Sequence, residues 1–503
     1  MENNSGIDLR ESRPLLEVED LVTVSLKSNG EIRTVDGVSF HIDRGEIYGL
    51  VGESGSAKST IAKSIMDIIP QEKGYPIEGR VLFNQMDLLF NTGKKGKNSK
   101  QGKKGRIHDQ FMTSIRGRYI SLIMQDSFKA MNPDITVGQH MTETLMAHRI
   151  TSLCNSILKR SELRKDDIYD LIEESRQEEY KNEQDSLLSE ISKRFGLEGF
   201  YTELSKIVSS QADYEVAVSR FMSRVKVELK EKEKDRISLL SKYYQRNEII
   251  MEMEEEIIQG LKSSEEVDIE DERKRFKKDF SPLATELFLK KSSLWKTIQK
   301  ESWERSLEIL RSLGIENPET IMNYVPDKLP PGLRHMCLFA MGIVTDPELV
   351  ILDETTSSMD VITRGRLLDF IEKNNQSQGT SYLLITNEIT LLAGICHRIG
   401  VIYGGKLIEE STGSEIFSNS KHPFTINYLS SSIVPYENLD VNLPRDFIDG
   451  EPPDPENPPS GCMFHPRCKF AMDVCSFKIP KLINVTPSHR VACFLYSNES
   501  EVH

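Results

Sequence analysis

Long hydrophobic runs are absent from the 503-residue sequence, because no apolar stretch reaches the roughly 18 residues of a membrane-spanning helix. An excess of basic residues is absent too. The 78 Asp and Glu outnumber the 64 Lys and Arg, and the net charge of -14 would repel a phosphate backbone. The first residues have neither the basic nor the apolar stretch of an export signal. These absences predict a soluble cytosolic protein that binds no nucleic acid.

Proline is absent from the whole stretch between Ile150 and Pro282, where glycine is also rare. Glu, Lys and Arg are dense there, and apolar residues recur at helical spacing, as at Val218, Phe221 and Val225. The pattern predicts an inserted helical module, with one long helix or two helices stacked as a hairpin over 216–261. Both an ordinary amphipathic subdomain and an arm for a specific partner have this composition.

Cysteine is scarce and unevenly placed, with seven residues in all and four of them in the last tenth of the chain: Cys462, Cys468, Cys475 and Cys493. In a reducing compartment this favours a metal or cluster site over disulfides. Four thiolates from one short segment suit zinc or an iron–sulfur cluster. Their spacings are looser than those of zinc ribbons, and His465 lies between two of them as a further possible ligand.

The stretch that organises the chain runs from Ile47 to Thr60, where an apolar strand meets a glycine-rich turn and then a helical pattern. It is close to G-x-x-x-x-G-K-[ST], a loop whose backbone N–H groups bind phosphate while its lysine and hydroxyl reach the β/γ-phosphates and Mg²⁺. Ala57 replaces the second glycine. If that position requires a positive φ, alanine costs on the order of 1 kcal/mol. The expected nucleotide-binding residues are Gly52, Gly55, Ser56, Ala57, Lys58, Ser59 and Thr60.

Two later strands end in polar residues suited to phosphate chemistry. One is followed by Gln125, which can reach the metal or the attacking water. The other leads into Asp353 and Glu354. An Asp at the end of a buried strand can bind Mg²⁺, directly or through water, and the Glu beside it can act as general base. We therefore expect Ser59, Gln125 and Asp353 around Mg²⁺, with Glu354 and Gln125 in the catalytic set.

These motifs, in this order, resemble those of the ATP-binding subunits of ABC transporters, within them the oligopeptide/dipeptide importer branch. The resemblance covers Leu15 to about His148 and about Glu301 to Phe494. Its residues are the phosphate loop, Gln125, Asp353 with Glu354, a D-loop-like Ser358-Met359-Asp360, the H-P-F-T at His422 to Thr425, and the cysteine-containing tail at Pro458 to Cys468.

Several further properties are implied by this resemblance. Two such subunits sandwich two ATPs, each lying between the Walker motifs of one subunit and the signature of the other. The implied partners are a second ABC ATPase subunit, two membrane permease subunits and, indirectly, an extracellular solute-binding protein. The implied location is peripheral, on the cytosolic face of the membrane. Similar four-cysteine tails in this branch hold a [4Fe–4S] cluster, with zinc as the alternative.

Two more family residues are missing. Where the signature reads L-S-G-G-x-R-Q, this chain has two prolines, Pro330 and Pro331, which remove the serine hydroxyl and two N–H donors. The histidine that contacts the γ-phosphate in the family is Asn387 here, which is expected in the catalytic set with Glu354 and Gln125. It can donate one neutral hydrogen bond but cannot take up a proton or carry a charge. With Ala57, these changes predict an asymmetric pair. This chain's Walker half binds ATP and hydrolyses it at most slowly, while the opposite site has little or no turnover.

The expected fold is α/β: a P-loop ABC-type nucleotide-binding domain with a long helical insertion and a small C-terminal cysteine-rich domain. The expected boundaries are 14–148 and 301–412 for the ATPase core, 149–300 for a charged coiled-coil-like module, and 413–503 for the C-terminal domain. The expected function is that of an ATPase subunit driving import of peptides or similar solutes. Two alternatives stay open: a non-transport ABC-type ATPase with a coiled-coil arm, and a purely regulatory ATP-binding subunit.

Overall fold

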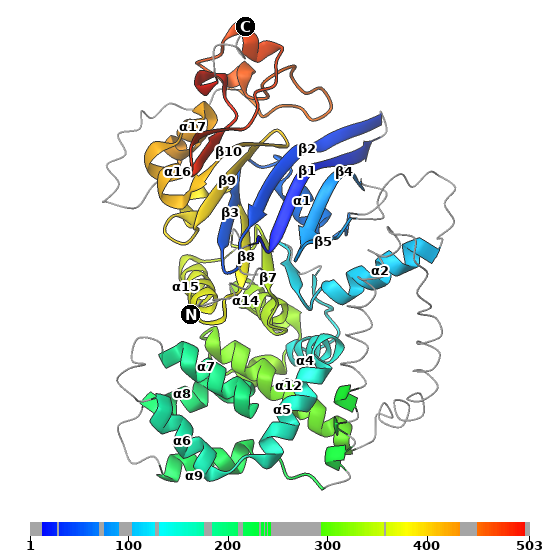
Figure 1. The fold of residues 1–503 in the computed structure, drawn as a ribbon, viewed down its shortest axis with the longest axis vertical. Coiled ribbons are helices and arrows are strands. Elements are labelled where there is room, and N and C mark those ends of the chain that lie inside the picture. The colour runs from blue at the N-terminus through cyan, green and yellow to red at the C-terminus, as the bar shows by residue number, and fades with distance from the viewer. Residues whose placement is uncertain are drawn as a thin grey trace, which may run out of the picture. The chain divides into compact units, whose positions relative to one another are not determined.

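A computed structural model describes residues 13–27, 30–69, 75–89, 103–125, 130–175, 184–209, 215–230, 233–235, 237–238, 240–242, 293–356, 359–432 and 450–497 (Figure 1). The chain divides into two compact units. The first, here called the sheet unit, comprises residues 1–126, 348–359 and 379–503, and the second, the helical unit, comprises 127–347 and 360–378. No helix in the described part of the chain is both long enough and apolar enough to span a membrane.

The larger sheet of the sheet unit has eight strands: β3 (Ile47–Val51), β6 (Ile120–Ile123), β7 (Leu349–Asp353), β8 (Ser381–Thr386), β9 (Arg398–Tyr403), β10 (Lys406–Thr412), β11 (Ile483–Thr486) and β12 (His489–Val491). Their order is β11-β12-β10-β9-β3-β8-β7-β6. The neighbours from β9 to β6 pair in parallel, and β3, β7 and β8 are buried at every residue. Burial on both faces explains why these strands are continuous apolar runs rather than alternating ones.

The smaller sheet is antiparallel, with the order β2-β1-β4-β5. Its strands are β1 (Leu16–Lys27), β2 (Gly30–Ile42), β4 (Tyr75–Phe83) and β5 (Met86–Asp87). Side chains from both sheets share one hydrophobic core, to which helix α1 (Lys58–Ile65) adds Ile61, Ala62 and Ile65. This core holds the turn between β3 and α1 in place.

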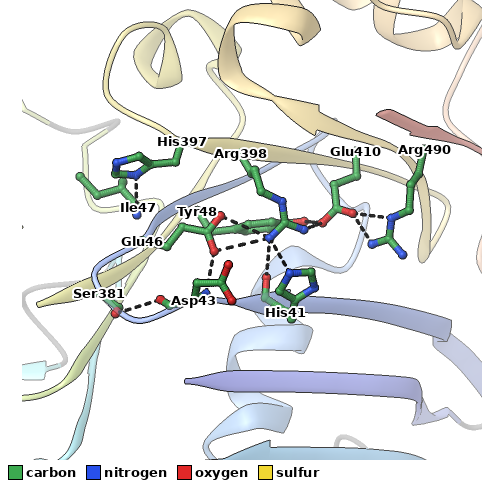
Figure 2. A network of polar contacts seen from close by, with 10 residues as sticks. All are labelled: His41, Asp43, Glu46, Ile47, Tyr48, Ser381, His397, Arg398, Glu410 and Arg490. Carbon is green, nitrogen blue, oxygen red and sulfur yellow. Dashed lines mark hydrogen bonds and ion pairs between the residues drawn. The ribbon is translucent and has the colours of Figure 1, made fainter. Parts of the chain in front are cut away.

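A polar network joins the two ends of the chain within the sheet unit (Figure 2). The Tyr48 hydroxyl donates to Glu410 at 2.7 Å, and Arg398 donates to the same carboxylate at 2.7 Å. Arg490 on β12 donates to the other oxygen of Glu410, and His41 at the end of β2 accepts from Arg398 at 3.1 Å. Because Glu410 is buried, the donors Tyr48, Arg398 and Arg490 stabilise its charge. The network fixes the last strand of the chain to the strand that leads into the glycine-rich turn.

The remaining helices of the sheet unit are α2 (Lys103–Ile115), α16 (Gly413–Asn419) and α17 (Pro423–Ser431). Helix α17 begins with the H-P-F-T motif, where the His422 ring nitrogen accepts from the Phe424 N–H at 3.1 Å and Pro423 occupies the first helical position. Residues 450–497 form short 3-10 turns and the hairpin of β11 and β12.

The helical unit contains α4 (Val137–His148), α5 (Ile150–Glu162), α6 (Lys165–Ser175), α7 (Gln184–Phe195), α8 (Tyr201–Ser209), α9 (Glu215–Val225), α12 (Ser293–Ser312), α13 (Pro318–Met322), α14 (Pro331–Ile343) and α15 (Val361–Gln378). Helix α4 starts with a capping box, in which Thr136 and Gln139 bond each other's backbone N–H. The helices α6 to α9 bury their own core, with Phe200 and Phe221 edge to face at 6.4 Å.

For 216–261 the sequence left two alternatives, one long helix or two helices stacked as a hairpin. The single long helix is wrong in its described part, and the hairpin stays a prediction. Helix α9 ends at Val225, and a new helical turn follows Lys230, whose N–H donates to the Glu233 carboxylate at 3.1 Å. The apolar spacing was read correctly, because Val218, Phe221, Met222 and Val225 are buried. These residues pack into a compact helical core rather than along a coiled-coil seam. Residues 243–290 lie outside the described residues.

Candidate nucleotide-binding site

The turn between β3 and α1 has the left-handed backbone that the motif requires. Gly55 has φ 82°, and Ala57 has φ 77° and ψ 14°, so the missing glycine falls at a position where an L-residue is strained. The cost for a non-glycine residue in this region is about 1–2 kcal/mol. A side chain at Gly52 would meet the Ile402 carbonyl at 2.1 Å, which explains the glycine that begins the turn. The turn therefore forms, but the left-handed backbone of Ala57 reduces its stability.

Lys58 is buried, with 2% of its side chain exposed, and its ammonium is held inside the turn. It donates to the carbonyls of Gly52 at 2.7 Å and Glu53 at 2.9 Å and to the Ser56 hydroxyl at 3.3 Å. Glu354 lies 3.7 Å from the same nitrogen. Burial lowers the pKa of Lys58, while the Glu354 carboxylate opposes that shift. The ammonium is thus already placed at the turn that would receive phosphate oxygens.

The Ser59 hydroxyl donates to Asp353 at 2.7 Å. The two residues come from α1 and the end of β7, and their oxygens are the ligand type that Mg²⁺ prefers. Burial raises the pKa of Asp353, and the hydrogen bond from Ser59 opposes this shift. Next in the chain, Glu354 has φ 52°, and its N–H donates to the Ile385 carbonyl at 2.9 Å. Backbone strain at Glu354, beside the buried carboxylate of Asp353, is typical of a functional site.

The two other expected residues lie at the ends of neighbouring strands. Gln125 follows β6, which pairs in parallel with β7, and Asn387 follows β8, which pairs with β3 and β7. Both side chains are exposed, and neither belongs to the residues that line the cavity beside the turn. The Asn387 carbonyl and the Gly52 carbonyl both accept from the Tyr428 hydroxyl of α17.

A cavity of about 470 Å³ opens beside the turn, within the usual size of small-molecule sites. The predicted residues that line it are Gly55, Ser56, Ala57, Lys58, Ser59, Thr60 and Glu354. Its other walls are β2 residues 31–34, the turn at Tyr403 to Gly405, and residues 452–456. Phosphate-binding groups therefore share one cavity with segments that are remote in sequence.

Sequence reasoning missed Arg467, a residue of the cysteine-containing tail that hydrogen-bonds to the glycine-rich turn. Its guanidinium donates to both oxygens of Glu53, at 2.9 and 3.2 Å, and to the Tyr403 hydroxyl at 3.0 Å. A bidentate arginine–carboxylate pair is directional as well as strong. The only sequence signal was that Arg467 lies beside Cys468, and nothing there indicated a partner 414 residues away.

The four tail cysteines line one small cavity, together with His422, Phe464 and His465. Burial raises the pKa of the Cys462 thiol to about 11 and that of Cys493 to about 12, and the neighbouring thiolates add to both shifts. Thiols that line one space are the ligand type that zinc and iron–sulfur clusters take. In the described part of the chain, however, no group of three or more His, Cys, Asp or Glu side chains is placed to hold a metal ion.

In the helical unit, the altered signature forms the start of α14. Pro330 is the N-cap residue, without a side-chain hydrogen bond, and Pro331 occupies the first helical position. The Pro330 carbonyl accepts from the Arg334 N–H at 2.9 Å, so the helix begins normally. The backbone N–H groups of Gly332 and Leu333 belong to its first turn. The prolines thus remove donors without disturbing the helix, as expected of proline in a first turn.

Comparisons with known proteins agree with this geometry. Residues 35–242 match the family model described as ABC transporter, and residues 408–475 match the model described as oligopeptide/dipeptide transporter, C-terminal region. The chain thus has the nucleotide-binding turn, the Asp–Glu strand and the sheet of an ABC-type ATPase. Its C-terminal region is similar to that of the oligopeptide/dipeptide branch of the ABC transporter ATP-binding subunits.

Curated relatives have similar overall extent. The dipeptide transport ATP-binding protein DppD of Caldanaerobacter subterraneus subsp. tengcongensis is 24% identical over 96% of this chain and 97% of its own length. The oligopeptide transport ATP-binding protein AppD of Bacillus subtilis is 24% identical over 96% and 98%. Among solved structures, the dimeric bacterial ABC transporter cassette MJ0796 covers 79% of this chain and 98% of its own at 14% identity, with a TM-score of 0.40.

Proposed function

We propose that this chain is the degenerate half of an asymmetric ATPase pair in an ABC importer for peptides or similar solutes. The names of its relatives refer to dipeptide and oligopeptide transport, which supports this solute class. The proposal includes two membrane permease subunits, a second ATPase subunit and an extracellular solute-binding protein as partners. It locates the chain on the cytosolic face of the membrane. The matched C-terminal region and the short described helices disfavour a non-transport ATPase with a coiled-coil arm.

The observation that carries the proposal is the contrast between two sets of residues. Lys58 lies within reach of Glu354, and Ser59 bonds Asp353, as an active Walker half requires. The start of α14 offers a proline ring where the family has a serine hydroxyl. We infer that this chain's Walker half works when a partner's signature completes it. The opposite site, completed by Pro330 and Pro331, binds ATP with little turnover.

Each residue has an assigned role in this proposal. Lys58 and the N–H groups of residues 55–60 hold the β- and γ-phosphate oxygens. Ser59, Asp353 and Gln125 hold Mg²⁺, which when bound neutralises phosphate charge. Glu354 accepts a proton from the attacking water, and Asn387 donates a neutral hydrogen bond to the γ-phosphate.

The test is ATP turnover by the complete complex with Glu354→Gln in this chain alone. We expect a loss of about 10²-fold or more, because the substitution removes the general base while keeping its shape. Glu372→Gln on the exposed face of α15 is the matched control and should leave turnover unchanged. Unchanged turnover in Glu354→Gln would overturn the assignment and leave this chain as a purely regulatory ATP-binding subunit.

We also propose a [4Fe–4S] cluster on Cys462, Cys468, Cys475 and Cys493, with zinc as the alternative group. The cavity that these thiols share supports this assignment. Thiolate ligands select iron–sulfur clusters and zinc over harder metals, and such a group when bound would neutralise part of the thiolate charge. The residues of this tail would then hold both the cluster and, through Arg467, the phosphate-binding turn.

A further inference from the structure

All three hydrogens of the Lys58 ammonium have acceptors within the glycine-rich turn. These acceptors are the carbonyls of Gly52 and Glu53 and the hydroxyl of Ser56. If ATP binds at this turn, a phosphate oxygen has to displace at least one of them from the ammonium. The displaced group then needs another donor, because a buried polar group without a partner costs more than its hydrogen bond contributed.

The Gly52 carbonyl accepts the shortest of these bonds, at 2.7 Å, and Gly52 is buried. A second donor is already close to it. The Tyr428 hydroxyl lies 3.3 Å from this oxygen, beyond the usual spacing of about 2.7–2.8 Å, and also donates to the Asn387 carbonyl. Since a phenol has one hydrogen, the two carbonyls share it, and the Gly52 carbonyl has the smaller part. Asn387 is exposed, so water can serve its carbonyl when the hydrogen moves toward Gly52.

The ring of Tyr428 is held in place independently of its hydroxyl. It stacks on Phe424, one turn earlier in α17, with centroids 5.3 Å apart and planes 17° apart. Phe424 is itself fully buried. Burial raises the pKa of the Tyr428 phenol, and the carboxylates of Glu53 and Glu354 add to the shift. The phenol therefore keeps the proton that it donates.

We propose that Tyr428 is a positioning residue of the phosphate-binding turn, whose hydroxyl bonds the Gly52 carbonyl when the Lys58 ammonium moves to a phosphate. This inference rests on the proposed binding of ATP at the turn. With the hydroxyl in place, the buried carbonyl is never left without a donor, and the phosphates bind more tightly. Tyr428 does not line the cavity, so it acts through Gly52 rather than by touching ATP.

The first experiment uses Tyr428→Phe, which keeps the ring stacked on Phe424 and removes only the hydroxyl. Calorimetry on the full-length chain with Mg²⁺ compares the binding of ATP with that of inorganic tripolyphosphate, which has no base or sugar. We expect both affinities to fall about tenfold, because the unpaired carbonyl arises whenever a phosphate draws the ammonium away. Tyr324→Phe is the control and should alter neither affinity, since Tyr324 is a 40% exposed residue of the helical unit that does not line the cavity.

Two outcomes of this experiment would overturn the proposal. One is an unchanged ATP affinity in Tyr428→Phe. The other is a loss of ATP affinity without a loss of tripolyphosphate affinity, because Tyr428 would then act on the base or the sugar rather than through the turn. Neither outcome depends on whether this chain hydrolyses ATP.

A second experiment needs no nucleotide. Without ligand the Gly52 carbonyl has both donors, so Tyr428→Phe should shift the denaturation midpoint only slightly in the wild-type background. In Lys58→Met the phenol is the described donor that remains, so the same substitution should lower the midpoint clearly more. The lost bond to Asn387 is common to both backgrounds and cancels.

A tyrosine with a merely structural role would lower the midpoint equally in both backgrounds, and that result would overturn the proposal. A wild-type chain that bound neither ATP nor tripolyphosphate would refute the proposed function instead. The comparison of midpoints would still decide whether Tyr428 and Lys58 serve the same carbonyl.

Discussion

At the residue scale, Ala57 is the clearest case of a local rule broken at a site. Its φ of 77° is a value that glycine adopts freely and alanine does not, so the phosphate-binding turn forms in spite of its sequence. The sequence motif located both the turn and the misfit, since the glycine pattern fixes the backbone conformation. It did not reveal that Glu354 is similarly strained, at φ 52°, because that depends on strands from distant parts of the chain.

Ala57→Gly should therefore raise the free energy of unfolding by about 1 kcal/mol and tighten Mg·ATP binding. The matched control is Ala62→Gly in the same helix, where a glycine should destabilise by about 1 kcal/mol. Chemical denaturation of both variants measures the two effects. If both substitutions shift stability in the same direction, backbone strain at residue 57 is not the cause.

A second residue-scale prediction concerns His41 and acid. Burial, followed by the Arg398 charge, lowers the pKa of His41 below its ordinary 6.5, while Asp43 and Glu410 oppose the shift and Arg490 adds to it. A lowered folded pKa means that the contribution to stability is full above about pH 6.5 and is lost as the pH falls through the folded value. The unfolding free energy of wild type relative to that of His41→Gln should therefore decrease as the pH falls below about 6.5. A constant difference from pH 7 to pH 5 would refute this.

At the element scale, α14 forms a normal helix although its first residues lack the groups of the family signature. Pro331 fits the first helical position, so the helix is stable, yet the hydroxyl and donors that a partner's γ-phosphate would meet are missing. Sequence reasoning identified this loss because proline acts locally. It failed on the single-helix alternative for 216–261, since α9 ends at Val225. The Phe221 ring of α9 packs against Phe200, a contact that no local pattern encodes.

Restoring the signature residues at the start of α14 should raise ATP turnover at the opposite site. In complexes that carry Glu354→Gln in this chain, adding Pro330→Ser and Pro331→Gly should raise ATP turnover at least about tenfold, because a serine N-cap and two backbone N–H groups are restored. A serine at residue 330 adopts the present φ of -54° without strain. Turnover that stays at the Glu354→Gln background would mean that the prolines are not what silences this site.

At the scale of the whole molecule, the tail and the ATPase sheet form one unit. Arg490 and His489 on β12 bind Glu410 and Glu409 on β10, at 2.6 and 2.7 Å. The sequence divided the chain into a core and a separate C-terminal domain, a division that stays a prediction. These contacts join strands that are 80 residues apart in the sequence, and for that reason no local spacing or motif could reveal them.

The proposed cluster leads to a prediction at the same scale. Chain purified without oxygen should contain about four iron and four sulfide, and Cys493→Ser should lose them. Because Arg467 adjoins Cys468, loss of the group should also weaken ATP binding, whereas Cys154→Ser, in the buried core of the helical unit, should retain the iron. Stoichiometric zinc in place of iron would establish the alternative, and a metal-free wild-type chain would contradict both.

The order of the strands also governs how the protein is made. Strand β3 leaves the ribosome early, but its neighbours are β8 and β9, which are synthesised only after the entire helical unit. At about 5–20 residues per second, this delay is on the order of tens of seconds. During that time the apolar β3 has no partner strand, while the helical unit can already fold from its own local contacts. The phosphate-binding turn is thus among the first parts to be translated and among the last to become functional.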